Sequence, residues 1–130
     1  MKKLVSYPAI FHEEDNGYFV EFPDLEGCFT QGENLTEATV KAHEVLGYYL
    51  EDFDLNSLPE SSDIKSLTTT DDAFASIIAI DLIEHRKKYN NKAVKKTLTI
   101  PEWLNEAAQN ENINFSQLLQ EAIMEKLDLS

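Results

Sequence analysis

The segment His85-Arg-Lys-Lys-Tyr-Asn-Asn-Lys-Ala-Val-Lys-Lys-Thr-Leu-Thr-Ile-Pro-Glu-Trp-Leu104 differs from the rest of the chain in charge and in pattern. Its first twelve residues hold six lysine and arginine side chains and no acidic one, in a protein of 130 residues with a formal net charge of −13. The residues from Thr97 to Ile100 alternate polar and apolar up to Pro101, which is typical of a short strand that leads into a helix. The segment therefore predicts a separate C-terminal module.

The charge of the chain is divided unequally. Residues 1–84 contain four basic and eighteen acidic side chains, whereas residues 85–130 contain seven basic and six acidic ones. A strongly acidic part repels nucleic acid and attracts basic surfaces, although such a charge also serves solubility. We predict an acidic partner-binding domain in residues 1–84, a basic linker in residues 85–92 and a small C-terminal domain in residues 93–130.

The sequence contains one cysteine, Cys28, which excludes an internal disulfide bond and suits a reducing compartment. The N-terminal Met-Lys-Lys-Leu lacks the apolar run of a signal peptide, since Ser6 and Pro8 interrupt it. No stretch approaches eighteen apolar residues, the length of a membrane span. We expect a soluble, cytoplasmic protein without membrane contacts.

The acidic domain begins with a pattern that predicts an antiparallel meander. Residues 4–11 alternate, and Pro8 favours an edge position or a bulge. Asn16-Gly17 is a strong hairpin signal and precedes a return strand over residues 18–22. A third short strand follows over residues 28–30.

A helix is expected after the meander. Asn34 can accept an amide of the first turn, and Glu37 can reach back to complete a capping box. Apolar residues recur at helical spacing from Leu35 to Phe53. After a polar connection, the β-branched run of residues 74–80 fits a buried fourth strand. The predicted order is β-β-β-α-β.

The C-terminal domain is predicted to contain one strand and two helices. Pro101 is favoured in the first turn of a helix, Asn112 can end that helix in a left-handed turn, and Asn114 can begin the second. A lone strand with two short helices leaves backbone groups unpaired and has too little core. Two copies paired about a twofold axis would close a two-stranded ribbon, so we predict a homodimer.

The outer face of that ribbon is expected to bind DNA. Alternate strand residues share a face, which separates the polar ribbon residues from Leu98 and Ile100. A two-stranded ribbon fits the major groove, where lysine and threonine can contact base edges, and a helix start can hold a phosphate. The candidate DNA contacts are three ribbon residues, two at the start of the second helix and one in the linker: Lys95, Thr97, Thr99, Phe115, Ser116 and Lys92.

Several segments resemble known families. Residues 95–104 followed by Asn112-Ile-Asn-Phe-Ser-Gln-Leu-Leu-Gln-Glu-Ala122 resemble a ribbon-helix-helix repressor domain. Tyr7-Pro-Ala-Ile-Phe11, Gly17-Tyr-Phe-Val-Glu-Phe-Pro-Asp-Leu-Glu-Gly27 and Ala38-Thr-Val-Lys-Ala42 resemble the HicB family of antitoxins. The resemblance covers nearly the whole chain.

The resemblance implies an α+β protein, with a β-β-β-α-β partial ribonuclease-H-like domain and a C-terminal ribbon-helix-helix (β-α-α) dimerisation domain. HicB proteins neutralise HicA, a small basic ribonuclease with a catalytic histidine. The resemblance therefore implies an antitoxin that is not an enzyme, has no cofactor or metal, and represses its operon by binding operator DNA as a dimer. With the toxin it would form a heterotetramer or a larger assembly.

The charge of the acidic domain agrees with a basic partner. The candidate toxin contacts are two sets of acidic side chains, on the first hairpin turn and after the first helix: Glu13, Glu14, Asp15, Glu51, Asp52 and Asp54. The second set follows the C-terminal end of a helix, where negative charge is locally unfavourable, and this is a weak indication of a role in binding.

Other functions remain open. The acidic domain could sense a small ligand in a free-standing ribbon-helix-helix transcription factor. A metal-dependent nuclease would need converging carboxylates; Asp24, Glu26, Glu44 and Asp81 are available, but their spacing resembles no metal site. Cys28 with His12 or His43 lacks the motif of a nucleophilic pair.

Overall fold

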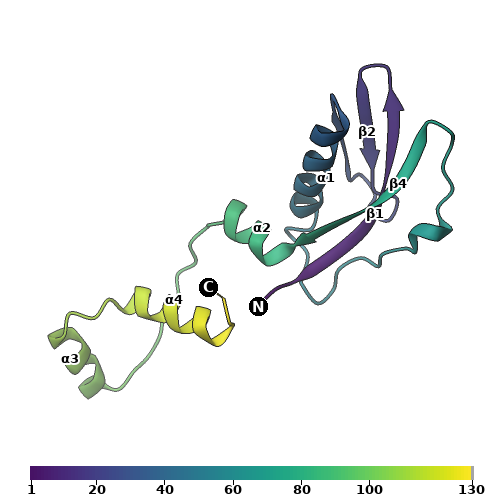
Figure 1. The fold of residues 1–130 in the computed structure, drawn as a ribbon. Helices are drawn as coiled ribbons and strands as arrows, with labels where there is room; N and C mark the ends of the chain where they lie inside the picture. Colours follow the sequence, from purple (N-terminus) through teal and green to yellow (C-terminus); the bar gives the residue numbers. More distant parts are fainter. Residues whose placement is uncertain (130) are drawn as a thin grey trace. The chain divides into compact units, whose positions relative to one another are not determined.

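The computed structural model describes residues 1–129, and the chain forms two compact units, Lys2–Asn91 and a second that begins at Lys92. The first unit contains β1 (Leu4–Glu14), β2 (Gly17–Glu21), β3 (Phe29–Gly32), α1 (Leu35–Tyr49), the 3-10 helix η1 (Ile64–Ser66), β4 (Ala73–Asp81) and α2 (Leu82–Tyr89) (Figure 1). The second contains α3 (Glu102–Asn110) and α4 (Phe115–Lys126). The fold is α+β, as predicted.

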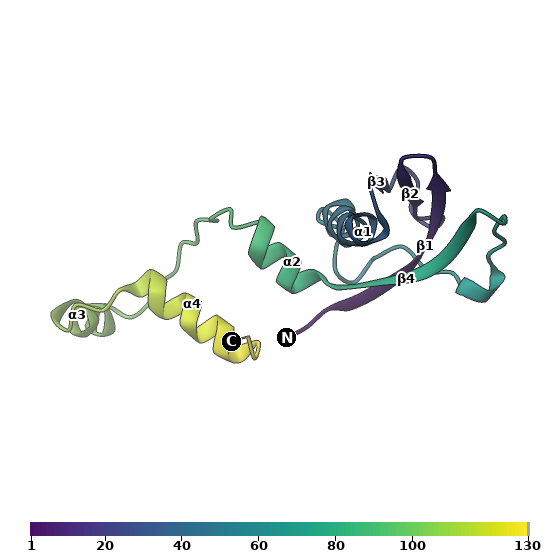
Figure 2. The same cartoon turned by 45° about the horizontal axis from the view of Figure 1, so that its top comes forward.

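The four strands form one antiparallel sheet in the order β3-β2-β1-β4. β1 is the long inner strand and pairs with β2 on one side and with β4 on the other. The helix α1 lies against one face of this sheet, as the turned view shows (Figure 2). The predicted order β-β-β-α-β is confirmed for this unit.

The core lies between α1 and the sheet. Asn34 begins α1 by accepting the Glu37 amide at 2.8 Å, and small Ala38 and Ala42 let the helix approach the sheet closely. The predicted reciprocal bond is displaced by one residue, since the Glu37 carboxylate accepts from the amide of Glu33. The buried core residues come from both layers and their loops: Tyr7, Ala9, Phe11, Val20, Phe22, Leu25, Cys28, Ala38, Ala42, Leu46, Leu50, Ile78 and Leu82.

The first hairpin closes one residue earlier than predicted. Glu14 pairs with Gly17, so Asp15 and Asn16 form the turn. Gly17 is the first residue of β2, where its φ of +142° and a collision between an added Cβ and the Gly32 carbonyl oxygen exclude larger residues. Gly17 is therefore needed where β2 closely approaches the end of β3.

Two hydrogen bonds, one at each end of the β1–β4 ladder, show which of its opposing residues form hydrogen-bonded pairs. The Glu13 amide donates to the Asp72 carbonyl at 2.9 Å, and the Leu82 amide donates to the Lys3 carbonyl at 2.9 Å. Antiparallel pairs alternate between bonded and non-bonded. Odd-numbered residues of β1 and even-numbered residues of β4 therefore direct their backbone groups toward each other.

Pro8 lies in this inner strand, so the expectation of an edge position or a bulge is wrong. The register continues through Pro8 opposite Ile77 without interruption. Because only odd-numbered residues of β1 direct their backbone groups toward β4, the Pro8 nitrogen faces away from β4 and toward the side of β2. β2 pairs only as far as Glu21 opposite Ile10, so no ladder bond is lost at the proline.

A helix occupies much of the segment expected as a basic linker. Asp81 caps α2 by accepting the amides of Ile83 at 3.0 Å and Glu84 at 3.5 Å. The helix continues to Tyr89, and the boundary between the two units falls after Asn91. Residues 85–89 therefore belong to the acidic unit.

Two side chains of α2 pack against the C-terminal end of α1. Arg86 donates from Nη2 to the carbonyl oxygens of Leu50 at 3.1 Å and Phe53 at 2.8 Å. The His85 ring lies against the backbone of Gly47, where an added Cβ would overlap the ring. Part of the basic segment therefore stabilises the fold, since Arg86 donates to two carbonyl oxygens of the turn that follows α1.

The second unit has helices but no strand of its own. The left-handed Asn112, with φ of +54°, and the Asn114 cap, which accepts the Gln117 amide at 3.0 Å, are confirmed. No strand occurs between Asn90 and Pro101 in the described chain, in contrast to the predicted strand. A strand requires a hydrogen-bonded neighbour, and this single chain supplies none there.

The apolar side chains of the second unit are largely exposed. Ala108 is its one buried apolar residue within the described part, whereas Trp103 is 69% exposed. The other large apolar side chains that remain exposed are Val94, Leu98, Ile100, Leu104, Ile113, Phe115, Leu118, Ile123, Met124 and Leu127. This unit does not form a core of its own.

Gly47→Ala is expected to destabilise the chain against urea by about 1–3 kcal/mol, because the new methyl group overlaps the His85 ring. In a helix without this neighbour, the same change would stabilise by roughly 0.5–1 kcal/mol. The double variant with His85→Ala is the control, and a coupling energy of at least about 0.5 kcal/mol between the two changes is expected. A stabilising Gly47→Ala would contradict this packing.

Burial raises the pKa of the Cys28 thiol from 9.0 to about 11. The folded chain keeps this proton where the unfolded chain loses it, so the contribution of the thiol to stability is present below pH 9 and is lost between about pH 9 and pH 11. At pH 8 we expect alkylation by iodoacetamide to be roughly 100-fold slower in the folded chain than in urea. Equal rates in the two states would show that the thiol is accessible.

Candidate binding surfaces

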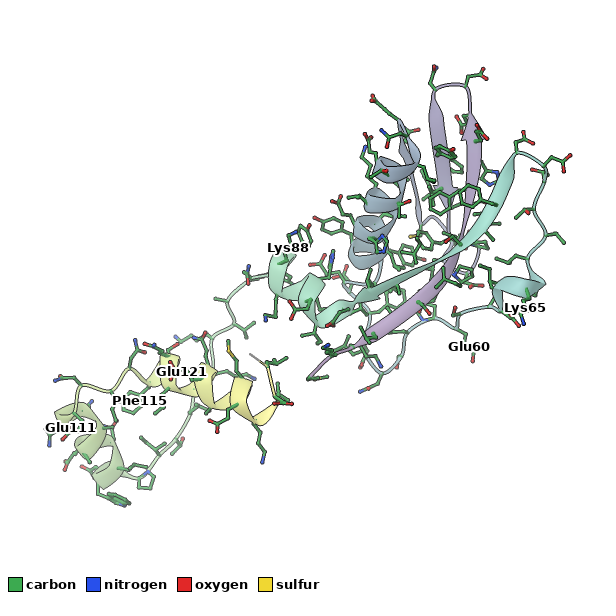
Figure 3. The ribbon with its side chains drawn as sticks, in the orientation of Figure 1. Glu60, Lys65, Lys88, Glu111, Phe115 and Glu121 are labelled. Atoms are coloured by element: carbon green, nitrogen blue, oxygen red, sulfur yellow. The ribbon has the colours of Figure 1, made fainter. Side chains whose placement is uncertain are left out.

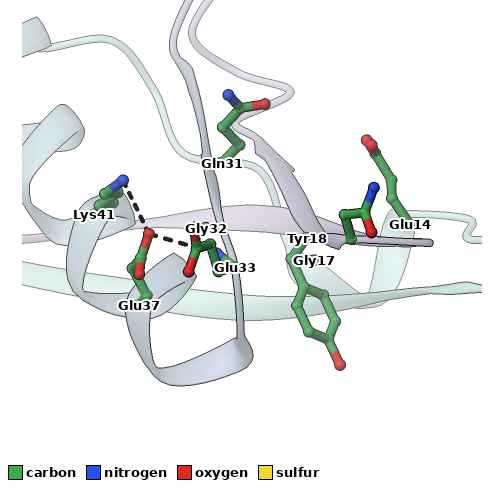
Figure 4. Close-up of a pocket in the computed structure, with 9 residues that line it drawn as sticks. Glu14, Gly17, Tyr18, Gln31, Gly32, Glu33, Glu37 and Lys41 are labelled. Atoms are coloured by element: carbon green, nitrogen blue, oxygen red, sulfur yellow. Dashed lines mark hydrogen bonds and ion pairs between the residues drawn. The ribbon is translucent and has the colours of Figure 1, made fainter.

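A pocket of about 340 Å³ opens between the first hairpin and the start of α1 (Figure 4). Its lining comes from β1, β2, β3 and α1: Glu14, Asn16, Gly17, Tyr18, Gln31, Gly32, Glu33, Glu37 and Lys41. Lys41 Nζ lies 3.1 Å from a carboxylate oxygen of Glu37, and this bond is the main cause that lowers the pKa of Glu37. The one cation of the pocket is thereby paired, and Glu14 and Glu33 leave the pocket acidic.

More acidic side chains lie around this pocket. The hairpin residues Glu13, Glu14 and Asp15 are exposed, and the amide of Glu13 bonds to Asp72 in the turn before β4. Three separate segments thus meet at one end of the sheet. We call this the hairpin-end acidic surface, and it consists of Glu13, Glu14, Asp15, Glu33, Glu37, Asp71 and Asp72.

The second predicted acidic set lies elsewhere. Glu51, Asp52 and Asp54 follow the C-terminal end of α1, whereas Glu37 is in its first turn. The 15 residues of α1 separate the two ends by about 22 Å, at 1.5 Å per residue. The Asp54 carboxylate accepts a hydrogen bond from the Asn56 amide at 2.9 Å and thereby stabilises the turn that contains both residues. The structure therefore does not unite the two sets.

Two of the four carboxylates considered for metal binding, Asp24 and Asp81, have structural partners. Asp24 accepts from the amide of Ser62 at 2.8 Å, and Asp81 accepts from the amide of Lys3 at 3.2 Å besides capping α2. No cluster of three or more His, Cys, Asp and Glu side chains with metal-binding geometry occurs in residues 1–129.

The two histidines considered for catalysis bond to groups other than the buried thiol. His12 Nε2 lies 3.4 Å from Glu21 Oε1, and His43 Nδ1 lies 2.8 Å from the Thr39 carbonyl oxygen. Cys28 is only 2% exposed. These contacts give the pair no nucleophilic arrangement.

Sequence analysis missed a second pocket of about 400 Å³ between α1, β4 and α2. His43, Ile80, Glu84, His85 and Tyr89 line it, and burial lowers the pKa of His85. Lys88 of α2, labelled in Figure 3, also lines it. The pattern Asp81-Leu-Ile-Glu84 is a capping signal that could have indicated α2 and hence this pocket.

The candidate DNA contacts lie in the second unit. Lys92, Lys95, Thr97 and Thr99 are all exposed in the segment between the helices α2 and α3. The second unit holds four basic and six acidic side chains, and three of the four basic ones lie between Lys92 and Lys96. Most of the positive charge of this unit thus lies in the expected ribbon and the residues just before it, and the fourth basic residue, Lys126, lies at the end of α4.

Phe115, labelled in Figure 3, and Ser116 are the first two residues of α4, and both are exposed. Asn114 takes the amide of Gln117, and the backbone amides of Phe115 and Ser116 have no bond among the described residues. Such amides at a helix start can bind an anion. The apolar Leu98, 64% exposed, lies in the same unit.

No helix of the described chain is both long and apolar enough to cross a bilayer.

The chain resembles proteins of known type over nearly its whole length. The family model described as "HicB_like antitoxin of bacterial toxin-antitoxin system" matches residues 7–123. A chain from a toxin–antitoxin complex of Streptococcus pneumoniae is 36% identical, with a TM-score of 0.59 over 95% of this chain and 99% of that one. An uncharacterised 14.9 kDa protein of Haemophilus phage HP1 is 30% identical over 100 residues, which are 73% of this chain and 72% of the phage protein.

The antitoxin HicB of Burkholderia pseudomallei is similar in fold, with a TM-score of 0.50, 21% identity and coverage of 95% of this chain and 98% of that one. The family match spans both units and includes most of the described elements. The chain belongs to the HicB-like antitoxin family of bacterial toxin–antitoxin systems.

Proposed function

We propose that this protein is a cytoplasmic antitoxin without catalytic activity. Its acidic unit binds and neutralises a small basic HicA-type toxin that cleaves mRNA, and its second unit binds operator DNA as a homodimer and represses the operon. The observation that carries the proposal is the family match over residues 7–123, which joins both units in one protein. A relative at 36% identity belongs to a toxin–antitoxin complex, which supports a toxin partner.

The charge of the first unit supports a basic partner. Residues 2–91 contain seven basic and eighteen acidic side chains, a net charge of −11. Among the exposed acidic groups, the hairpin-end acidic surface is the favoured toxin contact, because three segments contribute to it beside an open pocket. The set Glu51, Asp52 and Asp54 is less favoured, since Arg86 lies in that turn and binds its carbonyls.

The exposed apolar side chains of the second unit support dimerisation. Trp103, Leu98 and Leu118 are each more than half exposed, and an unpaired ribbon segment precedes α3. A second copy would pair the ribbon and cover these side chains, which gives the β-α-α ribbon-helix-helix arrangement. The folded state of this unit would then depend on protein concentration.

The paired ribbon would present its polar face twice. Lys95, Thr97 and Thr99 of each copy then form a double row that fits the major groove, with Lys92 near the phosphates. The free amides of Phe115 and Ser116 would hold a backbone phosphate on either side. The first unit, a partial ribonuclease-H-like domain in this proposal, lies outside the DNA contact because its charge opposes it. A dimer whose two acidic units each bind one toxin is a heterotetramer, the smallest assembly in which every toxin site is occupied.

Reversing charge on the hairpin-end acidic surface is expected to weaken toxin binding. Glu13→Lys with Glu14→Lys should reduce the affinity for the toxin at least about tenfold. Added salt should narrow the difference in affinity between the variant and the wild type. Calorimetry of the full chain with the product of an adjacent gene for a small basic protein measures this. Glu51→Lys with Asp52→Lys is the matched control and should change affinity less than about threefold. A larger effect in the control would assign the toxin contact to the end of α1.

Thr97→Ala with Thr99→Ala is expected to lower specific DNA binding without removing nonspecific binding. Each lost base contact should cost roughly 1–3 kcal/mol. Fluorescence anisotropy with DNA from upstream of the gene and with shuffled DNA gives the specificity ratio. Thr68→Ala with Thr69→Ala, in the connection before β4, is the control. An unchanged ratio in the first variant would exclude the ribbon face as the reader of sequence.

A further inference from the structure

The outer edge of β4 is unusually suited to pairing with another strand. β4 is a terminal strand of the sheet, and β1 covers only one of its sides. The eight residues Ala73–Ile80 contain no charged residue and no proline, and their register with β1 is free of bulges. Charges, prolines and bulges are the common means by which proteins protect such an edge. Between Ala73 and Ile80 none of them occurs, and the one charged residue of β4, Asp81, lies at its end and caps α2.

The backbone of this edge has unpaired groups. Because even-numbered residues of β4 bond to β1, the amides and carbonyls of Ala75, Ile77 and Ala79 point outward. Ala73 donates to the Thr70 carbonyl at 3.1 Å, but the outward groups of the other three have no backbone partner in residues 1–129. Phe74 and Ile77 are 42% and 46% exposed.

The sequence of the edge is nearly symmetric about Ile77. Ala75 and Ala79 lie two positions to either side, and the large apolar Phe74 and Ile80 lie three positions away. In a twofold antiparallel contact centred on Ile77 each residue lies opposite its mirror position in the partner, so small residues meet small ones, Phe74 meets Ile80, and Ser76 meets Ile78 as the one unlike pair. A highly basic partner strand would find no opposite charge between Ala73 and Ile80. The occupant that fits is a second copy.

We infer that β4 pairs antiparallel with β4 of a second copy, with Ile77 opposite Ile77, so that two four-stranded sheets join into one. Ala75 then lies opposite Ala79, and Phe74 opposite Ile80, which extends the apolar face across the junction. This self-contact uses only the first unit and is separate from the ribbon dimer. A chain with both contacts can assemble beyond a dimer.

Cysteine crosslinking in the full chain tests this register. In the inferred pairing the two Ile77 residues form a hydrogen-bonded pair with Cα atoms about 5.5 Å apart, within the range of a disulfide. Two copies of Ala79 would instead lie roughly 13 Å apart along the strands, since each is opposite Ala75. The native Cys28 is buried and its raised pKa keeps it unreactive, so the wild-type chain is the blank.

With diamide as oxidant, Ile77→Cys is expected to form a disulfide-linked dimer at least about tenfold faster than Ala79→Cys. The double variant Ala75→Cys with Ala79→Cys should again crosslink rapidly, because the new thiol at position 75 of one copy then lies opposite the new thiol at position 79 of the other. Added salt should accelerate crosslinking, because two units of net charge −11 repel each other. Salt acts on toxin binding in the opposite direction, so the two contacts are distinguishable.

Equal rates for Ile77→Cys and Ala79→Cys would overturn the inference, since they would indicate random collision. Absence of crosslinks in both Ile77→Cys and the double variant, in chains that unfold in urea as the wild type does, would also overturn it. Neither result depends on toxin or DNA.

Discussion

The pairing of β1 on both of its sides is the constraint on which the first unit depends. β1 binds β2 through a tight hairpin and β4 through a ladder whose partners are 61 to 77 positions apart in the chain. This ladder fixes which face of β4 meets α1 and which of its backbone groups point outward. It also determines where Pro8 can be accommodated. The free edge of β4 follows from the β1–β4 register, whereas the pocket and most of the acidic surface follow from the β1–β2 hairpin and the pairing of β2 with β3.

The second constraint is the docking of α2 on α1. Arg86 donates hydrogen bonds to carbonyl oxygens in the turn after α1, and Gly47 leaves room for the His85 ring. This contact withdraws basic side chains from the segment before the ribbon, so the positive charge of the second unit is limited to Lys92, Lys95, Lys96 and Lys126. The structural boundary therefore divides the charge less sharply than the composition suggests, because residues 2–91 have a net charge of −11 and residues 92–130 a net charge of −2.

Local signals in the sequence predicted the elements well, because capping and turn chemistry act over a few residues. Asn34, Asn112 and Asn114 behave as their types require. Apart from α2, whose local capping signal at Asp81 was not recognised, the failures concern distant partners. Pro8 suggested an edge because the end of β2 is not visible locally, and the two acidic sets could be placed relative to each other only once α1 was seen to separate them. The toxin and DNA contacts remain predictions for the same reason.

The distance in sequence between β1 and β4 has a consequence for synthesis of the chain on the ribosome. The β1–β2 hairpin emerges first, yet one side of β1 stays unpaired until the residues of β4 have been translated. Closing so long a loop is entropically costly, so the sheet closes late compared with its hairpin. A nascent or truncated chain that ends before Asp81 thus exposes the inner strand and the core face that α1 cannot cover alone. Exposed apolar surface and an unpaired strand favour aggregation, so correct folding of the first unit requires translation through β4.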